Sequence, residues 1–168
     1  MGNLFNIQGQ VVVITGGLGV LGRGIAAYLA GEGARVVILG RKAEEGDRLV
    51  TEIKAAGGEA LFLLTDVMNR ELLEQNREAI LSKYGRIDTL LNAAGGNMKG
   101  ATIPPDQTFL DLKLEDFRQV VDLNLFGSNS ANMMKLMCAV IVAVTLAIPA
   151  MREYTEHRKL MREAKKDA

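Results

Sequence analysis

The residues best suited to chemistry in this sequence are four glycines that follow a short apolar run. Val11–Thr15 carries no charge and is rich in β-branched residues, and an alanine- and leucine-bearing segment follows the glycines. Strand, glycine-rich turn and helix, in that order, direct backbone N–H groups and a helix N-terminus at a phosphate. Gly16 allows a tight turn with positive φ, and Gly22 lets the helix pack closely on the strand. Gly17 and Gly19 let the backbone approach a pyrophosphate. The pattern predicts a dinucleotide site, with a plain structural loop as the alternative.

The elements that must position these glycines alternate along the chain. The sequence predicts strands at Val11–Thr15, Ala34–Leu39, Glu59–Thr65 and Ile87–Leu91, and helices over Val20–Ala30, Arg41–Ala56, Arg70–Lys83 and Leu114–Phe126. Alternating strands and helices indicate βαβ crossovers and a parallel sheet that is covered on both faces. The predicted fold class is therefore α/β, a Rossmann-type doubly wound parallel sheet of about four to five strands. We expect Phe117, Val120, Val121 and Asn124 on an inward stripe of the last helix.

Polar or small residues follow each predicted strand, where ligands of such sheets bind. Gly40 and Arg41 follow the second strand, and a glycine beside a cation suits the 2′-phosphate of NADP better than the free ribose of NAD. NAD stays open, and so does a solvated Arg41 at the start of a helix. Asp66 is expected at the adenine edge, or else as the acid that starts the next helix. The small residues of Asn92–Gly95 let that loop lie against the adenosine ribose.

Composition limits the classes of function. The 168 residues suit one domain with a core, and 20 Lys and Arg balance 20 Asp and Glu, which gives no reason to expect nucleic acid as a partner. The single cysteine, Cys138, excludes an internal disulfide framework and fits a reducing compartment, so we expect a cytoplasmic protein. Cys138 stands in an apolar run and is expected to be a buried, inert thiol. No basic-then-apolar leader opens the sequence, and we expect no secretory signal.

Taken together, these residues closely resemble the short-chain dehydrogenase/reductase family. The family's Thr-Gly-x-x-x-Gly-x-Gly motif matches Thr15, Gly16 and Gly22, with Val20 in place of the middle glycine. Its strand-end Asn-Asn-Ala-Gly, adenine-contacting Asp-Val and helix asparagine correspond to Asn92-Ala93-Ala94-Gly95, Asp66-Val67 and Asn124. The resemblance implies Asn124 as a member of the catalytic set. With the strand-end argument, it gives these expected cofactor-binding residues: Thr15, Gly16, Gly17, Leu18, Gly19, Val20, Leu21, Gly22, Arg41, Asp66, Val67, Asn92, Ala93, Ala94 and Gly95.

The resemblance covers about residues 3–127. Four segments are similar to the sugar-acid branch of the family: Gly16–Gly22, Leu39–Arg41, Gly95–Asn97 and Thr108–Leu112. That branch contains D-mannonate oxidoreductase, also called fructuronate reductase. It implies an NAD(P)-dependent oxidoreductase that interconverts a ketone and a secondary alcohol on a sugar acid such as fructuronate or mannonate. The expected partner is a small-molecule substrate, which is a sugar acid or another ketone or alcohol. Assembly into a homo-oligomer stays open. We expect a dinucleotide-binding domain over residues 1–127 and an atypical tail over 128–168.

The tail departs from the family pattern. Past Asn124 the family supplies a strand serine and then Tyr-x-x-x-Lys, because ketone reduction needs a proton donor and a nearby lysine lowers the phenol's pKa. This sequence has no Tyr-x-x-x-Lys; the nearest match runs from Tyr154 to Arg158, and arginine does not replace lysine's compact ammonium. Ser128 and Ser130 come too soon after Asn124 to be the strand serine. The alternative function is therefore a truncated, catalytically incomplete nucleotide-binding remnant.

Two stretches of the tail differ in character. Leu136–Met151 carries no charge and is read as a buried fifth strand or helix, as exposed sequence of a truncated or frame-altered product, or as a membrane segment. We do not expect a membrane segment, because a span needs about 20 residues and Pro149 interrupts the run. Met151–Ala168 carries dense charge of both signs and is expected to be a solvated helix. His157 has no histidine or cysteine companion, so no metal site is expected.

Overall fold

A five-stranded parallel sheet organises the residues that the structure, a computed structural model, describes: 6–105, 108–132 and 140–143. The strands are β1 (Val11–Thr15), β2 (Arg35–Gly40), β3 (Glu59–Leu64), β4 (Thr89–Asn92) and β5 (Val140–Ala143). The α-helices are α1 (Val20–Gly31), α2 (Ala43–Ala55), α3 (Arg70–Tyr84), α4 (Leu114–Val121) and α5 (Gly127–Asn132). Two 3₁₀ turns, η1 (Lys99–Ala101) and η2 (Phe109–Asp111), precede α4, and a π-helical turn, η3 (Asp122–Phe126), joins α4 to α5.

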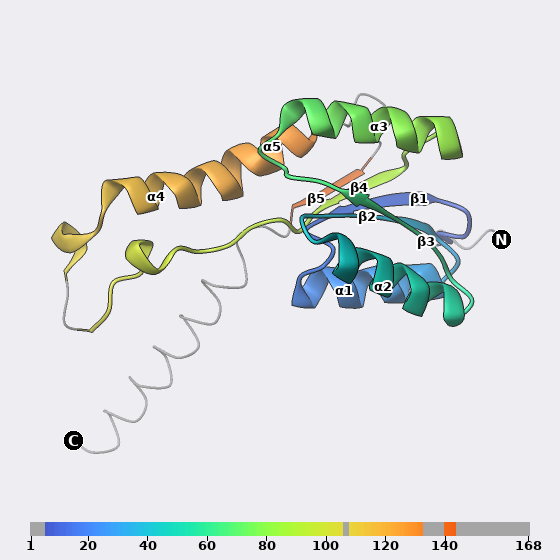
Figure 1. Cartoon of the computed structure of the whole chain (residues 1–168), viewed down its shortest axis with the longest axis horizontal. Helices are drawn as coiled ribbons and strands as arrows, with labels where there is room; N and C mark the ends of the chain where they lie inside the picture. Colours follow the sequence, from blue (N-terminus) through green and yellow to red (C-terminus); the bar gives the residue numbers. More distant parts are fainter. Residues whose placement is uncertain (1–5, 106–107, 133–139, 144–168) are drawn as a thin grey trace, which may run out of the picture.

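The sheet is buried on both faces by helices. Alternate residues of β1 point to opposite faces: Val12 and Ile14 join the core beneath α1 and α2, whereas Val11 and Val13 join the core beneath α3. Figure 1 shows α1 and α2 together on one side of the sheet and α3 on the other. Two apolar faces explain why β1 and β2 read as continuous apolar runs and not as alternating ones.

The order of the strands creates a switch point beside β1. The sheet runs β3-β2-β1-β4-β5, and each neighbouring pair is parallel. The chain therefore moves outward from β1 through β2 to β3, and then crosses to the other side of β1 to form β4. At the end of β1, Thr15 is level with Leu39 of β2 and Asn92 of β4. Loops that leave these ends in opposite directions open the crevice in which such sheets bind ligands.

Every strand and helix predicted up to β4 is present, with both ends within two residues of the predicted position. The predicted α/β fold class is confirmed. Part of the apolar run at 136–151 is the fifth strand: Val140–Ala143 pairs with β4, placing Ile141 opposite Leu90. The rest of that run lies outside the described residues, as do Cys138, Tyr154, His157 and Arg158.

The predicted inward stripe on the helix that begins at Leu114 is confirmed only in part. Val120, Val121 and Asn124 are half-buried, whereas Phe117 is 46% exposed. The helix packs against η1 instead of the sheet: a Cβ on Gly100 would overlap the Asp116 carboxylate, so the Asp116 side chain lies directly against the backbone of Gly100. Figure 1 shows α4 extending past the end of the sheet. The periodicity identified an amphipathic helix, and the surface it faces is a loop that shields only part of it.

The helix also continues beyond Phe126, its predicted end, through η3 and α5 to Asn132. The expected domain boundary at residue 127 falls inside this helical run, and the division into domain and tail stays a prediction. In the described part of the chain, no helix is long and apolar enough to cross a membrane. The same residues contain no group of three or more His, Cys, Asp or Glu side chains that could hold a metal ion.

Candidate functional site

The glycine turn between β1 and α1 is built from contacts that exclude side chains. Gly16 has a φ of +63°, the left-handed region that favours glycine. The Gly19 N–H donates to the carbonyl O of Gly16 at 2.9 Å and closes the turn. A Cβ on Gly22 would lie 2.5 Å from that same carbonyl O and 2.7 Å from the Cα of Gly17. The turn and the first turn of α1 are therefore in direct backbone contact, as the sequence predicted for Gly16 and Gly22.

The N-terminus of α1 has no protein side chain to cap it. Its N-cap is Gly19, no side chain accepts a hydrogen bond from the first turn, and that turn contains no acidic residue. The first N–H groups of a helix need acceptors, and the helix dipole favours negative charge there. By contrast, α3 is capped by the Asn69 side chain, which accepts from the Leu72 N–H at 3.0 Å. The end of α1 thus has the donors and the polarity that suit an anion.

Thr15 joins the glycine turn to the loop that follows β4. Its fully buried hydroxyl accepts a hydrogen bond from the Ala94 N–H at 3.2 Å, and its carbonyl O accepts from the Ala93 N–H at 3.1 Å. A Cβ on Gly16 would come within 2.6 Å of the Ala93 carbonyl O. The two loops at the switch point are therefore packed into one wall.

A cavity of about 290 Å³ lies at this edge of the sheet. Loops from four strand ends line it, and the helical residue Leu123 closes one side. Its lining consists of Gly16, Leu18, Gly19, Leu39, Gly40, Arg41, Lys42, Glu45, Thr65, Asp66, Val67, Ala93, Ala94, Gly95 and Leu123. Residues that lie far apart in the sequence thus meet at the carboxyl ends of the parallel strands. The sequence predicts that the ligand binds at these ends.

The end of β2 is covered by a leucine from the glycine turn. A Cβ on Gly40 would lie 2.7 Å from Leu18 Cδ1 and 2.9 Å from Leu18 Cγ. The side chain of Leu18 therefore occupies the space that a larger residue at position 40 would need. This contact makes the cavity floor apolar between the glycine turn and Arg41.

Charged residues occupy the wall beyond β2 and β3. Lys42 Nζ and Glu45 Oε1 are 2.7 Å apart, and this hydrogen bond is the main cause that lowers the pKa of the Glu45 carboxyl; the positive charges of Lys42, Arg23 and Arg48 also lower it. Asp66 turns the chain after β3, where its Oδ1 accepts from the Met68 N–H at 2.9 Å. The helix itself is capped by Asn69, so Asp66 is not the residue that starts it.

Asn124 fastens the loop after β4 to the helical run. Its amide Nδ2 donates to the carbonyl O atoms of Gly96 and Val120, each at 2.7 Å, and its Oδ1 accepts from the Gly96 N–H at 3.2 Å. The Val120 carbonyl is the one that the Asn124 backbone N–H would use in an α-helix. In η3 the Gly127 N–H instead donates to Asp122, five residues back, which is the π-helical pattern. Asn124 thus holds the loop at Gly96, next to the cavity residue Gly95.

The structure brings most of the expected cofactor residues together. Nine of them line the cavity: Gly16, Leu18, Gly19, Arg41, Asp66, Val67, Ala93, Ala94 and Gly95. The other six lie beside it and not on its wall: Thr15, Gly17, Val20, Leu21, Gly22 and Asn92. Thr15 and Asn92 are buried in the sheet, and a Cβ on Gly17 would lie 2.9 Å from Ile38 Cγ2, so packing explains that glycine. Val20 is 95% exposed. Ligand contacts at all fifteen positions stay predictions.

Gly40 lines the cavity beside Arg41, as the strand-end argument predicted, and five further cavity residues were not expected: Leu39, Lys42, Glu45, Thr65 and Leu123. Leu39 and Thr65 are strand-end residues, and the strand-end argument could have included them. Lys42 and Glu45 were harder to predict from the sequence, because their place on the cavity wall depends on how α2 is rotated about its axis. Leu123 adjoins Asn124 in the sequence, and it lines the cavity from the π-helical turn η3.

The parallel sheet, the glycine turn and the strand-end cavity define a dinucleotide-binding α/β protein of the Rossmann type. The sequence pattern of the short chain dehydrogenase family matches residues 10–156. The chain is 40% identical over 131 residues to the uncharacterized oxidoreductase UxuB of Bacillus subtilis (strain 168), covering 73% of this chain and 47% of that protein. This chain therefore belongs to the short-chain dehydrogenase family.

Solved structures agree with this assignment. A provisionally assigned D-mannonate oxidoreductase from Haemophilus influenza, solved with bound NAD, superimposes with a TM-score of 0.70 and 30% identity, covering 77% of this chain and 50% of that one. A variant of actinorhodin polyketide ketoreductase, solved with NADPH, superimposes with a TM-score of 0.66 and 29% identity, covering 75% and 46%. The chain thus spans about half the length of the relatives it matches.

Proposed function

We propose that this chain binds NADP in the cavity at the carboxyl edge of its sheet. The observation that carries the proposal is the pairing of two anion-binding features on one cavity: the uncapped N-terminus of α1 and the Arg41 side chain at the end of β2. The glycine turn admits a pyrophosphate against backbone N–H groups. Arg41 supplies a cation for a 2′-phosphate, and the loop Ala93–Gly95 offers small residues beside a ribose.

NAD is the second candidate, and particular observations favour each cofactor. Among the relatives, the Haemophilus structure contains NAD and the polyketide ketoreductase contains NADPH. The end of β2 in this chain has Gly40 and Arg41, and no carboxylate stands at that strand end to accept hydrogen bonds from ribose hydroxyls. We therefore rank NADP first.

As part of the same proposal, the chain belongs to an oxidoreductase that interconverts a ketone and a secondary alcohol on a sugar acid, such as fructuronate and mannonate. When bound, the nicotinamide cofactor supplies or accepts the hydride in such a reaction. The likeness to the Haemophilus D-mannonate oxidoreductase supports this substrate class. The exposed apolar side chains Phe117, Leu125 and Phe126 support assembly with further copies of the chain. A cytoplasmic location is proposed from the single cysteine.

The alternative is that this chain binds the cofactor without appreciable turnover. The favouring observation is that the 168 residues contain no Tyr-x-x-x-Lys, and no tyrosine among the described residues lines the cavity. Loss of a general acid alone removes about 10²- to 10⁴-fold in rate. Asn124, the proposed catalytic residue, holds the loop at Gly96 and supplies no such proton.

One pair of measurements separates these functions. Fluorescence titration with NADPH measures binding, and NADPH oxidation in the presence of fructuronate measures turnover. Binding together with turnover above about one per minute supports the enzyme, since typical enzymes turn over in seconds or faster. Binding without turnover supports the alternative. Absence of binding contradicts both.

Arg41 provides the sharper test of cofactor choice. We expect Arg41→Gln to weaken NADPH binding by roughly tenfold or more and to change NADH binding by less than about twofold, because only NADPH carries the 2′-phosphate. Arg70→Gln is the matched control: Arg70 is exposed, pairs with Glu74 on α3 and does not line the cavity. Equal effects of Arg41→Gln on the two nucleotides would contradict the assignment of Arg41.

A further inference from the structure

The cavity wall contains a carboxylate, that of Glu45, whose negative charge would repel the 2′-phosphate of the proposed ligand. Glu45 lies in the first turn of α2 and lines the cavity beside Arg41 and Lys42. Its carboxylate binds the Lys42 ammonium at 2.7 Å, while Arg41 has no ion pair among the described residues. With Asp66, the wall therefore has two positive and two negative side chains. A phosphate at this wall would be attracted by the charge of Arg41 and repelled by the charge of Glu45.

We propose that Glu45 is a specificity-determining residue that limits the preference of this cavity for NADP over NAD. The inference rests on the proposed function, because it concerns the same cavity and the same cofactor. Glu45 acts on the bound nucleotide in two ways. Its negative charge repels a 2′-phosphate, which has between one and two negative charges near pH 7. It also holds the Lys42 ammonium in an ion pair, so that this cation is not free to turn toward the phosphate.

The nucleotide without the 2′-phosphate feels neither effect. A neutral ribose is not repelled by the Glu45 carboxylate, and it would gain no ionic attraction if the Lys42 ammonium were free. Glu45 therefore lowers the affinity for NADPH and leaves that for NADH nearly unchanged. The ionised state that this requires is favoured at neutral pH, because Lys42, Arg23 and Arg48 all lower the pKa of the Glu45 carboxyl.

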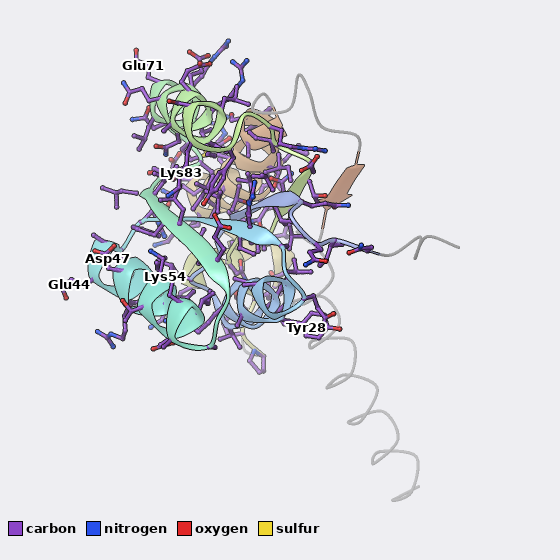
Figure 2. All side chains as sticks on the ribbon, turned by 90° about the vertical axis from the view of Figure 1, so that its right-hand side faces the viewer. Tyr28, Glu44, Asp47, Lys54, Glu71 and Lys83 are labelled. Atoms are coloured by element: carbon purple, nitrogen blue, oxygen red, sulfur yellow. The ribbon has the colours of Figure 1, made fainter. Side chains whose placement is uncertain are left out.

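The neighbouring residue Glu44 is the control for a purely structural role of Glu45. Acids in the first turn of a helix interact favourably with the helix dipole, and α2 has two of them, Glu44 and Glu45. Glu44 is exposed and does not line the cavity. Figure 2 shows Glu44 projecting from α2 away from the body of the molecule. If Glu45 served only the helix, replacing either acid would have the same result.

The experiment compares Glu45→Gln with Glu44→Gln by fluorescence titration of the full chain with NADPH and with NADH. Glutamine has the size of glutamate and favours helix equally. We expect Glu45→Gln to tighten NADPH binding about three- to tenfold and to change NADH binding by less than about twofold. We expect Glu44→Gln to alter neither by more than about twofold. The gain should shrink when the salt concentration rises from about 50 to about 500 mM, because salt screens exposed charges.

Each outcome decides a separate point. If the unmodified chain binds neither nucleotide, the proposed function fails and the inference fails with it. If the unmodified chain binds NADPH but Glu45→Gln and Glu44→Gln behave alike, only the role of Glu45 is overturned. A parallel gain for NADH and NADPH, or a gain that salt does not reduce, also overturns it, since neither result depends on the 2′-phosphate.

Discussion

The backbone around Gly22 leaves no room for a side chain at that position. A methyl group there would press on the carbonyl O of Gly16 and the Cα of Gly17, and both of these are backbone atoms. Backbone cannot rotate aside as a side-chain tip can, so either α1 must move outward or the turn must change shape. Gly24, two residues along the same helix, has nothing within 4 Å of its Cβ position.

Gly22 and Gly24 allow a matched test, in which one methyl group is added at each position in turn. We expect Gly22→Ala to lower the free energy of unfolding by about 1–3 kcal/mol and to weaken NADPH binding roughly tenfold or more, because overpacking displaces the turn. Gly24→Ala should leave binding unchanged and stabilise the chain by about 0.5–1 kcal/mol through helix propensity. Urea unfolding and nucleotide titration measure both quantities. Similar behaviour of the two variants would show that the contact at Gly22 does not position the turn.

Single residues also show what the sequence could and could not reveal about the site. The positive φ of Gly16, the contact made by Gly22 and the cavity position of Arg41 were all predictable, because each follows from local chain order around one strand end. Glu45 was not predicted, because its place on the wall depends on how α2 is rotated about its axis. That rotation is set by packing of α2 on the sheet, through contacts such as Gly46 against Phe62, which local sequence does not encode.

At the scale of elements, the end of α3 meets the starts of β2 and β3 at the edge of the sheet opposite the cavity. Arg35 of β2 and Glu59 of β3 form an ion pair at 3.3 Å, and the Arg35 guanidinium lies 5.9 Å from the centre of the Tyr84 ring. Burial raises the pKa of the Tyr84 phenol, and the negative charge of Glu59 raises it further, while Arg35 lowers it. The phenol therefore keeps its proton in the folded chain at a pH where it would lose it in the unfolded chain.

The raised pKa of Tyr84 predicts how the free energy of unfolding changes at alkaline pH. Below about pH 10 both states keep the phenol proton, so Tyr84 does not affect the pH dependence. Above that pH the unfolded state loses the proton first, so the free energy of unfolding falls as the pH rises. We expect Tyr84→Phe to make this fall shallower, and Tyr28→Phe, at a residue that is 68% exposed, to leave it as in the unmodified chain. Urea midpoints between about pH 8 and 11 provide the measurement; parallel curves for all three proteins would contradict it.

Elements were predictable where local pattern and tertiary packing agree. The strands and helices up to β4 follow from apolar runs separated by glycine, and the fold brings each onto a face that its pattern suits. The region from Leu114 to Asn132 was less predictable. An amphipathic pattern gives the phase of a helix but not its partner, and α4 packs on η1 and not on the sheet. The π-helical turn contains Asn124, which forms hydrogen bonds with the distant Gly96, and no local pattern contains that contact.

At the scale of the whole molecule, the parallel sheet makes the cavity a meeting point of distant segments. Its walls come from the loops after β1, β2, β3 and β4 and from Leu123. None of these loops forms the site alone, since each needs the strands to be paired in register. A ligand that contacts all of them binds the folded chain and not the unfolded one, so binding and folding are thermodynamically linked.

The linkage predicts that the proposed cofactor stabilises the entire chain. With NADPH at about one hundred times its dissociation constant, we expect about 2.7 kcal/mol of added stability, which corresponds to a rise of about 5–10 °C in the unfolding temperature. Differential scanning fluorimetry at increasing NADPH concentration measures it, with nicotinamide mononucleotide, which lacks the adenosine half, as the control. An unfolding temperature that does not respond to NADPH, or responds equally to the mononucleotide, would contradict the proposed mode of binding.

The contact between Leu18 and Gly40 bears on how this lineage can change over evolutionary time. An acid in place of Gly40 would offer oxygens to a ribose and favour NAD, but its Cβ needs the volume that Leu18 now fills. Shortening Leu18 beforehand would widen the cavity beside Gly40 and make that room available. The acid at position 40 is thus disfavoured until Leu18 has been replaced. Descendants of this sequence that gain an acid at position 40 should also have replaced Leu18, and an ancestor with an acid at position 40 should have had a smaller residue at position 18.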